Sequence, residues 1–108
     1  MTHYLVRNDT AAAIQSTLTK DNTGEVIDVL NDTVYLKVRL KNTDTVLFTL
    51  TGFGTPPELS NGVVTFAFSN NMIDIASGYY EGEIEINYLD TTVETVYELV
   101  NIKIRDDL

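Results

Sequence analysis

The sequence predicts one all-β, immunoglobulin-like antiparallel sandwich of about seven strands, with residues 1–108 forming a single domain. Two segments alternate strictly between apolar and polar residues, and turn-forming residues separate short apolar runs at near-regular spacing. No segment has the length and period of a crossover helix, which argues against a parallel α/β fold. With 108 residues and 44% hydrophobic content, the chain can bury one core but not two.

The clearest alternation runs from Thr33 to Lys41, where the even-numbered residues are apolar. The segment from Tyr80 to Tyr88 repeats this pattern, with glutamates at three of its odd-numbered positions. Each segment therefore predicts a half-buried strand. In an immunoglobulin-like sandwich they would be strands C and F, which are neighbours. We then expect Lys37, Arg39 and Lys41 to lie beside Glu81, Glu83 and Glu85.

Five weaker strand candidates complete the set: His3–Arg7, Ala13–Lys20 with Ile14 and Leu18 inward, Val46–Thr51, Val63–Phe68 and Thr92–Arg105. In the last of these the apolar residues change parity, so we expect a bulge or break near Glu98 and Leu99 that turns both sets inward. Pro56-Pro57 predicts a turn, and Asn61-Gly62 predicts a hairpin. Asn70–Ala76 predicts a single capped helical turn.

The segment Asp74–Tyr80 precedes the second alternating strand, at the place where immunoglobulin-like sandwiches have a tyrosine corner. The parity of Tyr80 matches that of the inward residues of its strand. We therefore interpret Tyr80 as the corner tyrosine, with Asp74 in the same turn, and expect Tyr79 to face outward. The alternative is a tyrosine pair that merely begins a strand.

Several segments carry a resemblance to a known family: Ile14–Asp21, Thr33–Val38, Gly62–Phe66, Ile73–Ala76, Gly78–Ile84, Thr95–Tyr97 and Ile102–Arg105. Over nearly its whole length the chain resembles the immunoglobulin-like N-terminal domain of bacteriophage baseplate upper proteins and related virion proteins. The resemblance implies a structural virion protein. Because the chain ends at Leu108, we expect a small component of its own, such as a capsid decoration, a head-fibre base, or an adaptor in the tail, neck or baseplate.

Composition bears on which partners and chemistries to expect. A net charge of −9 opposes the binding of nucleic acid, and no apolar stretch approaches the length of a membrane span or signal peptide. The chain has no cysteine and one histidine, His3, near a terminus that we expect to be mobile, which disfavours an enzyme. Asp21–Glu25 and Asn42–Asp44 carry oxygen ligands without the spacing of a calcium loop, so we expect neither a metal nor another cofactor.

The resulting hypothesis is a non-enzymatic protein that docks onto capsid or tail subunits, in several symmetric copies, within a virion assembled in the host cytoplasm. Candidate partner-binding residues are Phe53, Tyr35 and Tyr79. Phe53 lies in a loop bounded by glycine and proline, where it either covers the open end of the sandwich or projects as an anchor. The alternative hypothesis is a carbohydrate-binding or adhesion module that stacks sugar rings on Tyr35 and Tyr79.

Overall fold

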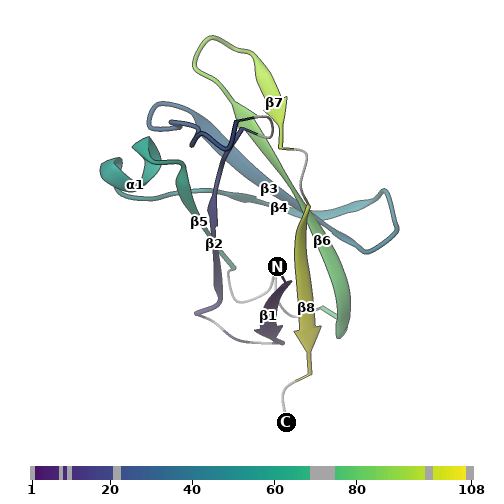
Figure 1. Ribbon diagram of the computed structural model, residues 1–108. Helices are drawn as coiled ribbons and strands as arrows, with labels where there is room; N and C mark the ends of the chain where they lie inside the picture. The colour runs from purple at the N-terminus through teal and green to yellow at the C-terminus, as the bar shows by residue number, and fades with distance from the viewer. Residues whose placement is uncertain are drawn as a thin grey trace.

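The structure, a computed structural model, describes residues 2–7, 9, 11–20, 23–68, 75–96 and 99–106. These residues form eight strands and one short helix (Figure 1). In chain order the elements are β1 (Thr2–Val6), β2 (Ala13–Thr17), β3 (Thr33–Leu40), β4 (Val46–Thr51), α1 (Pro56–Ser60), β5 (Val63–Ala67), β6 (Gly78–Asn87), β7 (Val93–Thr95) and β8 (Val100–Arg105).

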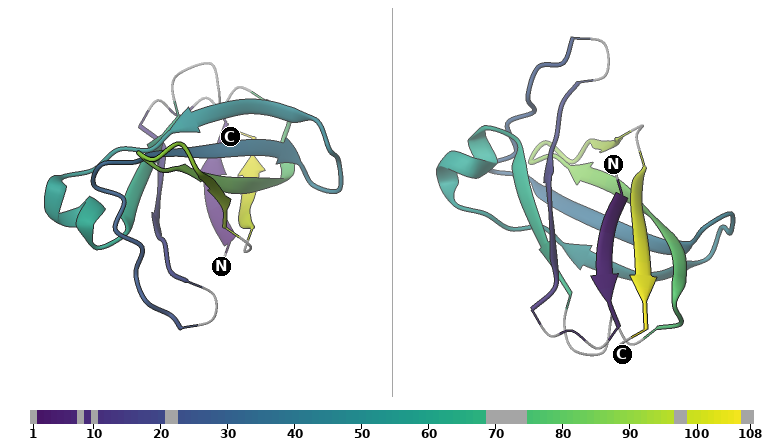
Figure 2. Two further views of the ribbon diagram at one scale, coloured as in Figure 1. Left: turned by 90° about the horizontal axis from the view of Figure 1, so that it is seen from above. Right: turned by 60° about the horizontal axis from the view of Figure 1, so that its bottom comes forward.

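The strands form two sheets that enclose one core. The larger sheet has the order β1-β8-β6-β3-β4, with β7 also paired to β6, and the smaller sheet is β2-β5. The views in Figure 2 show the smaller sheet on one side of the larger one. Apolar residues of both sheets are fully buried in a common cluster, among them Ile14 and Phe66 from the smaller sheet and Leu36 and Ile86 from the larger. The fold is an all-β, immunoglobulin-like sandwich in which β2 and β5 take the places of strands B and E, and β3, β6 and β8 those of C, F and G.

The central pairing of the larger sheet is antiparallel and continuous. Residues Thr33 to Leu40 of β3 lie opposite Asn87 to Tyr80 of β6, which confirms the neighbourhood expected for the two alternating segments. Val34, Leu36 and Val38 are buried as predicted. Leu40 is exposed instead, because the β3–β4 hairpin extends beyond the part of the sheet that the smaller sheet covers (Figure 1).

The expectation of a wholly antiparallel sandwich is wrong at one edge. β1 runs parallel to β8, with Thr2 opposite Asn101 and Val6 opposite Arg105. Parallel neighbours need a long connection between them. Here almost the whole domain lies between β1 and β8, so the chain path permits this pairing. Alternation in the sequence reveals which residues of a strand share a face but not the direction of its neighbour.

The C-terminal run is interrupted as predicted, which gives eight strands rather than about seven. β7 and β8 pair with opposite ends of β6. The described residues between Thr95 and Val100 are not in a strand. The interruption does not turn Val93 inward, contrary to expectation, since Val93 is 56% exposed. Val96 packs against the core instead and continues the parity of β8.

The helix α1 replaces the turn expected at Pro56-Pro57. Thr55 is its N-cap: the Thr55 Oγ1 accepts from the Glu58 backbone N–H, and the Glu58 carboxylate accepts from the Thr55 backbone N–H. This capping box, with proline in the first turn, is a helix start signal that the turn interpretation overlooked. Asn61-Gly62 ends the helix rather than forming a hairpin. Gly62 has a φ of +75°, which favours glycine.

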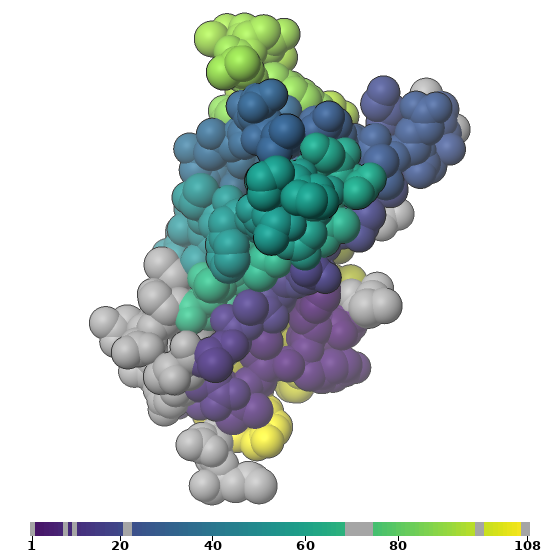
Figure 3. Space-filling model, turned by 90° about the vertical axis from the view of Figure 1, so that its left-hand side faces the viewer, coloured from purple at the N-terminus to yellow at the C-terminus, as the bar shows by residue number. Residues whose placement is uncertain are grey.

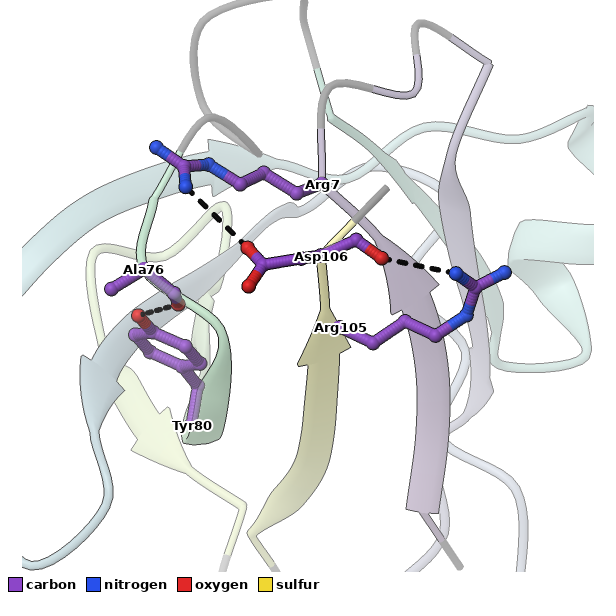
Figure 4. A network of polar contacts seen from close by, with 5 residues as sticks. All are labelled: Arg7, Ala76, Tyr80, Arg105 and Asp106. Atoms are coloured by element: carbon purple, nitrogen blue, oxygen red, sulfur yellow. Dashed lines mark hydrogen bonds and ion pairs between the residues drawn. The ribbon is translucent and has the colours of Figure 1, made fainter. Parts of the chain in front are cut away.

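The tyrosine at the start of β6 makes the hydrogen bond that a tyrosine corner requires. Tyr80 is 4% exposed, and its hydroxyl donates to the backbone carbonyl of Ala76 at 2.6 Å (Figure 4). Burial raises the pKa of the Tyr80 hydroxyl. Asp74 and most of the predicted turn Asn70–Ala76 lie outside the described residues, whereas Ile75 and Ala76 are not helical.

Replacing Tyr80 by phenylalanine should lower the free energy of unfolding by about 1 kcal/mol, because the ring stays buried while the hydrogen bond to Ala76 is lost. Urea denaturation measures this change. Tyr79→Phe is the matched control, since its exposed hydroxyl has no described partner, and it should change stability by less than about 0.5 kcal/mol. Equal effects of the two substitutions would contradict the corner assignment.

Candidate protein-binding surface

The outer face of the larger sheet, turned away from the core, carries most of the positive charge of the protein. Of the seven basic residues, five take outward positions on or directly after strands of this sheet: Lys37, Arg39, Lys41, Lys103 and Arg105. Arg7 follows β1 with the inward parity of Leu5 and lies near Tyr80. The seventh, Lys20, lies beyond β2. In a chain with a net charge of −9, this gathering of cations makes the outer face chemically distinct.

Part of that charge is neutralised between β3 and β6, as predicted. The Lys37 Nζ lies 2.6 Å from a Glu85 carboxylate oxygen, and the Arg39 Nε lies 3.7 Å from a carboxylate oxygen of Glu81. Lys37 is directly opposite Glu83 but pairs diagonally with Glu85. The hydrogen bond between Lys37 and Glu85 lowers the pKa of the Glu85 carboxyl and raises the pKa of the Lys37 amine.

Lys41 departs from the predicted pattern. The strand register places it beside Tyr79 rather than beside a glutamate, and its backbone N–H donates to the Tyr79 carbonyl at 3.1 Å. Its Nζ lies 5.9 Å from the centre of the Tyr79 ring. Lys103 approaches the same ring more closely, with its Nζ 4.2 Å from the centre. Both distances are within the range of cation–π attraction.

These residues belong to a row that crosses the sheet. Tyr4 of β1 is opposite Lys103 of β8, Lys103 is opposite Tyr79 of β6, and Lys41 follows β3. We name Tyr4, Lys103, Tyr79 and Lys41 the aromatic–cation row. Tyr4 is 78% exposed and Tyr79 is 58% exposed. Neither lysine of the row has a carboxylate within ion-pair distance among the described residues, so both charges remain available to a partner.

A hollow of about 260 Å³ lies at the β1 end of the row. Its walls are Tyr4, Leu5, Val6, Lys103 and Arg105, so apolar side chains lie next to two cations. We name this feature the Tyr4 hollow. It can accept an apolar side chain whose neighbours are acidic.

The end of β8 beside the hollow is held by polar contacts (Figure 4). Arg7 forms an ion pair with the Asp106 carboxylate at 3.4 Å, and Arg105 donates to the Asp106 backbone carbonyl at 3.0 Å. The Arg7–Asp106 pair, together with the hydrogen bond from the Arg7 backbone N–H to the Arg105 carbonyl at 2.9 Å, ties the ends of the two parallel strands together. The walls of the hollow therefore belong to a well-connected part of the sheet.

The three residues predicted to bind partners do not form one surface. Tyr79 faces outward as expected and is central to the aromatic–cation row. Tyr35 is partly buried and lies on β3, six residues before Lys41, which follows that strand; the two are roughly 20 Å apart along the chain. Phe53 is 54% exposed and bridges to Thr65 of β5, beside α1 and away from the row. The exposed ring of Phe53 fits a projecting side chain better than one that covers the open end of the sandwich.

Tyr4 and Lys103 were not identified from the sequence. Alternation within β1 and β8 could have placed both residues on outward faces. Their proximity depends on the parallel pairing of β1 with β8, which joins the two ends of the chain and which no local pattern indicates.

The described residues contain no group of three or more histidine, aspartate or glutamate side chains placed to hold a metal ion. His3 lies within β1 rather than in a mobile terminus, and burial lowers the pKa of its imidazole. In the part of the chain that the structure describes, no helix is long and apolar enough to cross a membrane.

No protein-family model matches the chain, and no curated protein matches it in sequence.

The ion pair on the outer face should depend on pH in a defined way. A double-mutant cycle with Lys37→Ala and Glu85→Ala should give a coupling of about 0.5 kcal/mol at neutral pH. Because the folded-state pKa of Glu85 is below its ordinary value of 4.5, this coupling is present above pH 4.5 and is lost as the pH falls through the lowered pKa. Because the folded-state pKa of Lys37 is above its ordinary value of 10.5, the coupling persists up to pH 10.5 and is lost as the pH rises through the raised pKa.

Urea denaturation of the four proteins at several pH values measures the coupling. The same cycle at Arg39 and Glu81 is the control and should give a smaller value, because the charged atoms there are 3.7 Å apart. A Lys37–Glu85 coupling that stays constant down to pH 2 would be inconsistent with the pair.

Proposed function

We propose that the chain is a non-enzymatic structural protein of a bacteriophage virion that docks onto other virion subunits through the outer face of its larger sheet. The observation that carries the docking role is the aromatic–cation row beside the Tyr4 hollow. Tyrosine and arginine are enriched at protein interfaces, and energetic hot spots consist of an anchor that enters a pocket. The virion setting rests on the resemblance of the chain to baseplate upper proteins.

The geometry of the row favours recognition over catalysis. Its groups are two phenol rings and two lysines, with no nucleophile paired to a base. They are fixed on paired strands, so little conformational freedom is lost when a partner binds. Symmetric repetition in a particle would add to this, since several weak contacts made together hold more strongly than one.

A carbohydrate-binding or adhesion role is the second candidate, favoured by the exposed rings of Tyr4 and Tyr79. One observation counts against it. Lys103 lies over the Tyr79 ring at 4.2 Å, where it would compete with a sugar ring for that face. Tyr35, the other predicted stacking residue, is too far along β3 to share a platform with Tyr79.

The docking role predicts that the tagged protein co-sediments with phage particles and that the double substitution Tyr4→Ser, Tyr79→Ser weakens this binding at least tenfold. Two exposed aromatic anchors would each be lost, at a cost typical of interface hot spots. Phe53→Ser is the matched control, because Phe53 is about as exposed as Tyr79 but lies elsewhere. Loss of binding in the control alone would assign the interface to the α1 side.

A glycan array with the wild-type protein separates the two candidates. Saturable binding of one sugar class, lost in Tyr4→Ser, Tyr79→Ser, would favour the carbohydrate-binding role. Absence of the protein from purified particles, as measured by mass spectrometry, would overturn the virion role.

A further inference from the structure

The β6–β7 hairpin presents a surface that is the chemical opposite of the Tyr4 hollow. At its tip Leu89 is 78% exposed, and Val93 on β7 is 56% exposed. Asp90 follows Leu89 in the chain, and the Leu89 backbone N–H donates to the Asp32 carboxylate at 3.0 Å. Glu94 lies opposite Ile86, on the other face of the hairpin from Val93. An exposed leucine next to carboxylates is the kind of group that an apolar hollow beside two cations can accept.

Hydrogen bonds fix the conformation of the tip. The Asp90 carboxylate accepts from the Thr92 backbone N–H at 3.0 Å, and the Tyr88 N–H donates to the Thr92 carbonyl at 2.9 Å. The hydrogen bonds from Thr92 lower the pKa of Asp90, which is therefore ionised at neutral pH. The Tyr88 hydroxyl donates to Glu94 at 2.6 Å; burial and this hydrogen bond raise the pKa of Tyr88 to about 12.

The hairpin tip and the Tyr4 hollow lie at opposite ends of an elongated molecule. The molecule measures 43 × 28 × 24 Å. β6 runs upward in Figure 1 towards the tip, whereas β1 and β8 run downward to Val6 and Arg105. Figure 3 shows the yellow-green tip standing clear of the rest of the surface. The two complementary surfaces of one copy therefore cannot meet each other.

We infer that two copies associate head to tail, with Leu89 of one copy in the Tyr4 hollow of the next and Asp90 facing Lys103 and Arg105. This inference deepens the proposed docking role and rests on it, because it names a second copy as a partner of the same surface. The contact is heterologous, so repeated copies form a ring or an open filament. Such arrangements suit a protein that surrounds a particle axis.

A contact made by one hairpin tip buries little surface, so each junction is weak in isolation. Ring closure or attachment to a particle would strengthen it, since neighbouring contacts raise the effective concentration. Free protein should therefore self-associate only at high concentration. The charges at the junction should also make this association weaker as salt is added.

Two variants test the inference. The hollow variant carries Tyr4→Ser and Lys103→Glu, and the tip variant carries Leu89→Ser and Asp90→Lys. The control carries Lys20→Glu and Val26→Ser, which makes one charge reversal and one loss of an exposed apolar side chain away from both surfaces. Circular dichroism and thermal unfolding establish that each variant is folded before its association is measured.

Sedimentation velocity up to about 1 mM is the measurement, because this is the range in which a small interface half-forms. Wild type and control should show concentration-dependent growth beyond a dimer. The hollow and tip variants should each remain monomeric when alone. An equimolar mixture of the two should form a heterodimer and nothing larger, because it retains one intact tip and one intact hollow.

A wild type that stays monomeric at about 1 mM would overturn the inference. Self-association that both variants retain would overturn it as well, as would a mixture that does not form the heterodimer. The proposed function is judged separately by co-sedimentation with particles. Particle binding without self-association would support the docking role and contradict the head-to-tail contact. Self-association without particle binding would support the head-to-tail contact and contradict the docking role.

Discussion

The structure depends on the antiparallel register between β3 and β6. This pairing joins Thr33–Leu40 to Asn87–Tyr80 without interruption and forms the centre of the larger sheet. Because successive side chains of a strand point to opposite faces, the register decides which residues of both strands enter the core. It places Leu36 and Ile84 inside and leaves Lys37 and Glu85 on the outer face, where they pair. A shift by one residue would bury charges and expose the core.

The same constraint gives adjacent tyrosines different roles. Tyr80 points inward and hydrogen-bonds Ala76, whereas Tyr79 points outward beneath Lys103. Since β8 pairs with β6 and β1 pairs with β8, the outward positions continue in one row as far as Tyr4. The proposed docking surface is thus a direct consequence of the sheet order. The acidic β6–β7 hairpin extends from the other end of the same strand, which separates the two complementary surfaces.

Sequence periodicity predicted what depends on neighbours within one strand. The alternation around Val34–Val38 and Ile84–Ile86 indicated the buried faces, and the parity of Tyr80 indicated an inward ring. The features that periodicity did not predict depend either on pairing between strands far apart in the chain or on local signals that conflict. The parallel β1–β8 edge, and with it the proximity of Tyr4 to Lys103, depends on the path of the whole chain. At α1, the capping signal of Thr55 and Glu58 outweighed the turn tendency of Pro56-Pro57. Val93 stayed exposed because Val96 takes the inward position.

The most direct test of the proposed sheet order is to measure the register between β3 and β6 in solution. In a nuclear Overhauser experiment we expect cross-strand backbone contacts between Leu36 and Ile84 and between Leu40 and Tyr80. Contacts should also join the Tyr79 ring to the Lys103 side chain. A register displaced by one residue, with the Tyr79 ring contacting Ile102 and other core residues, would contradict the account. It would remove both the tyrosine corner and the aromatic–cation row.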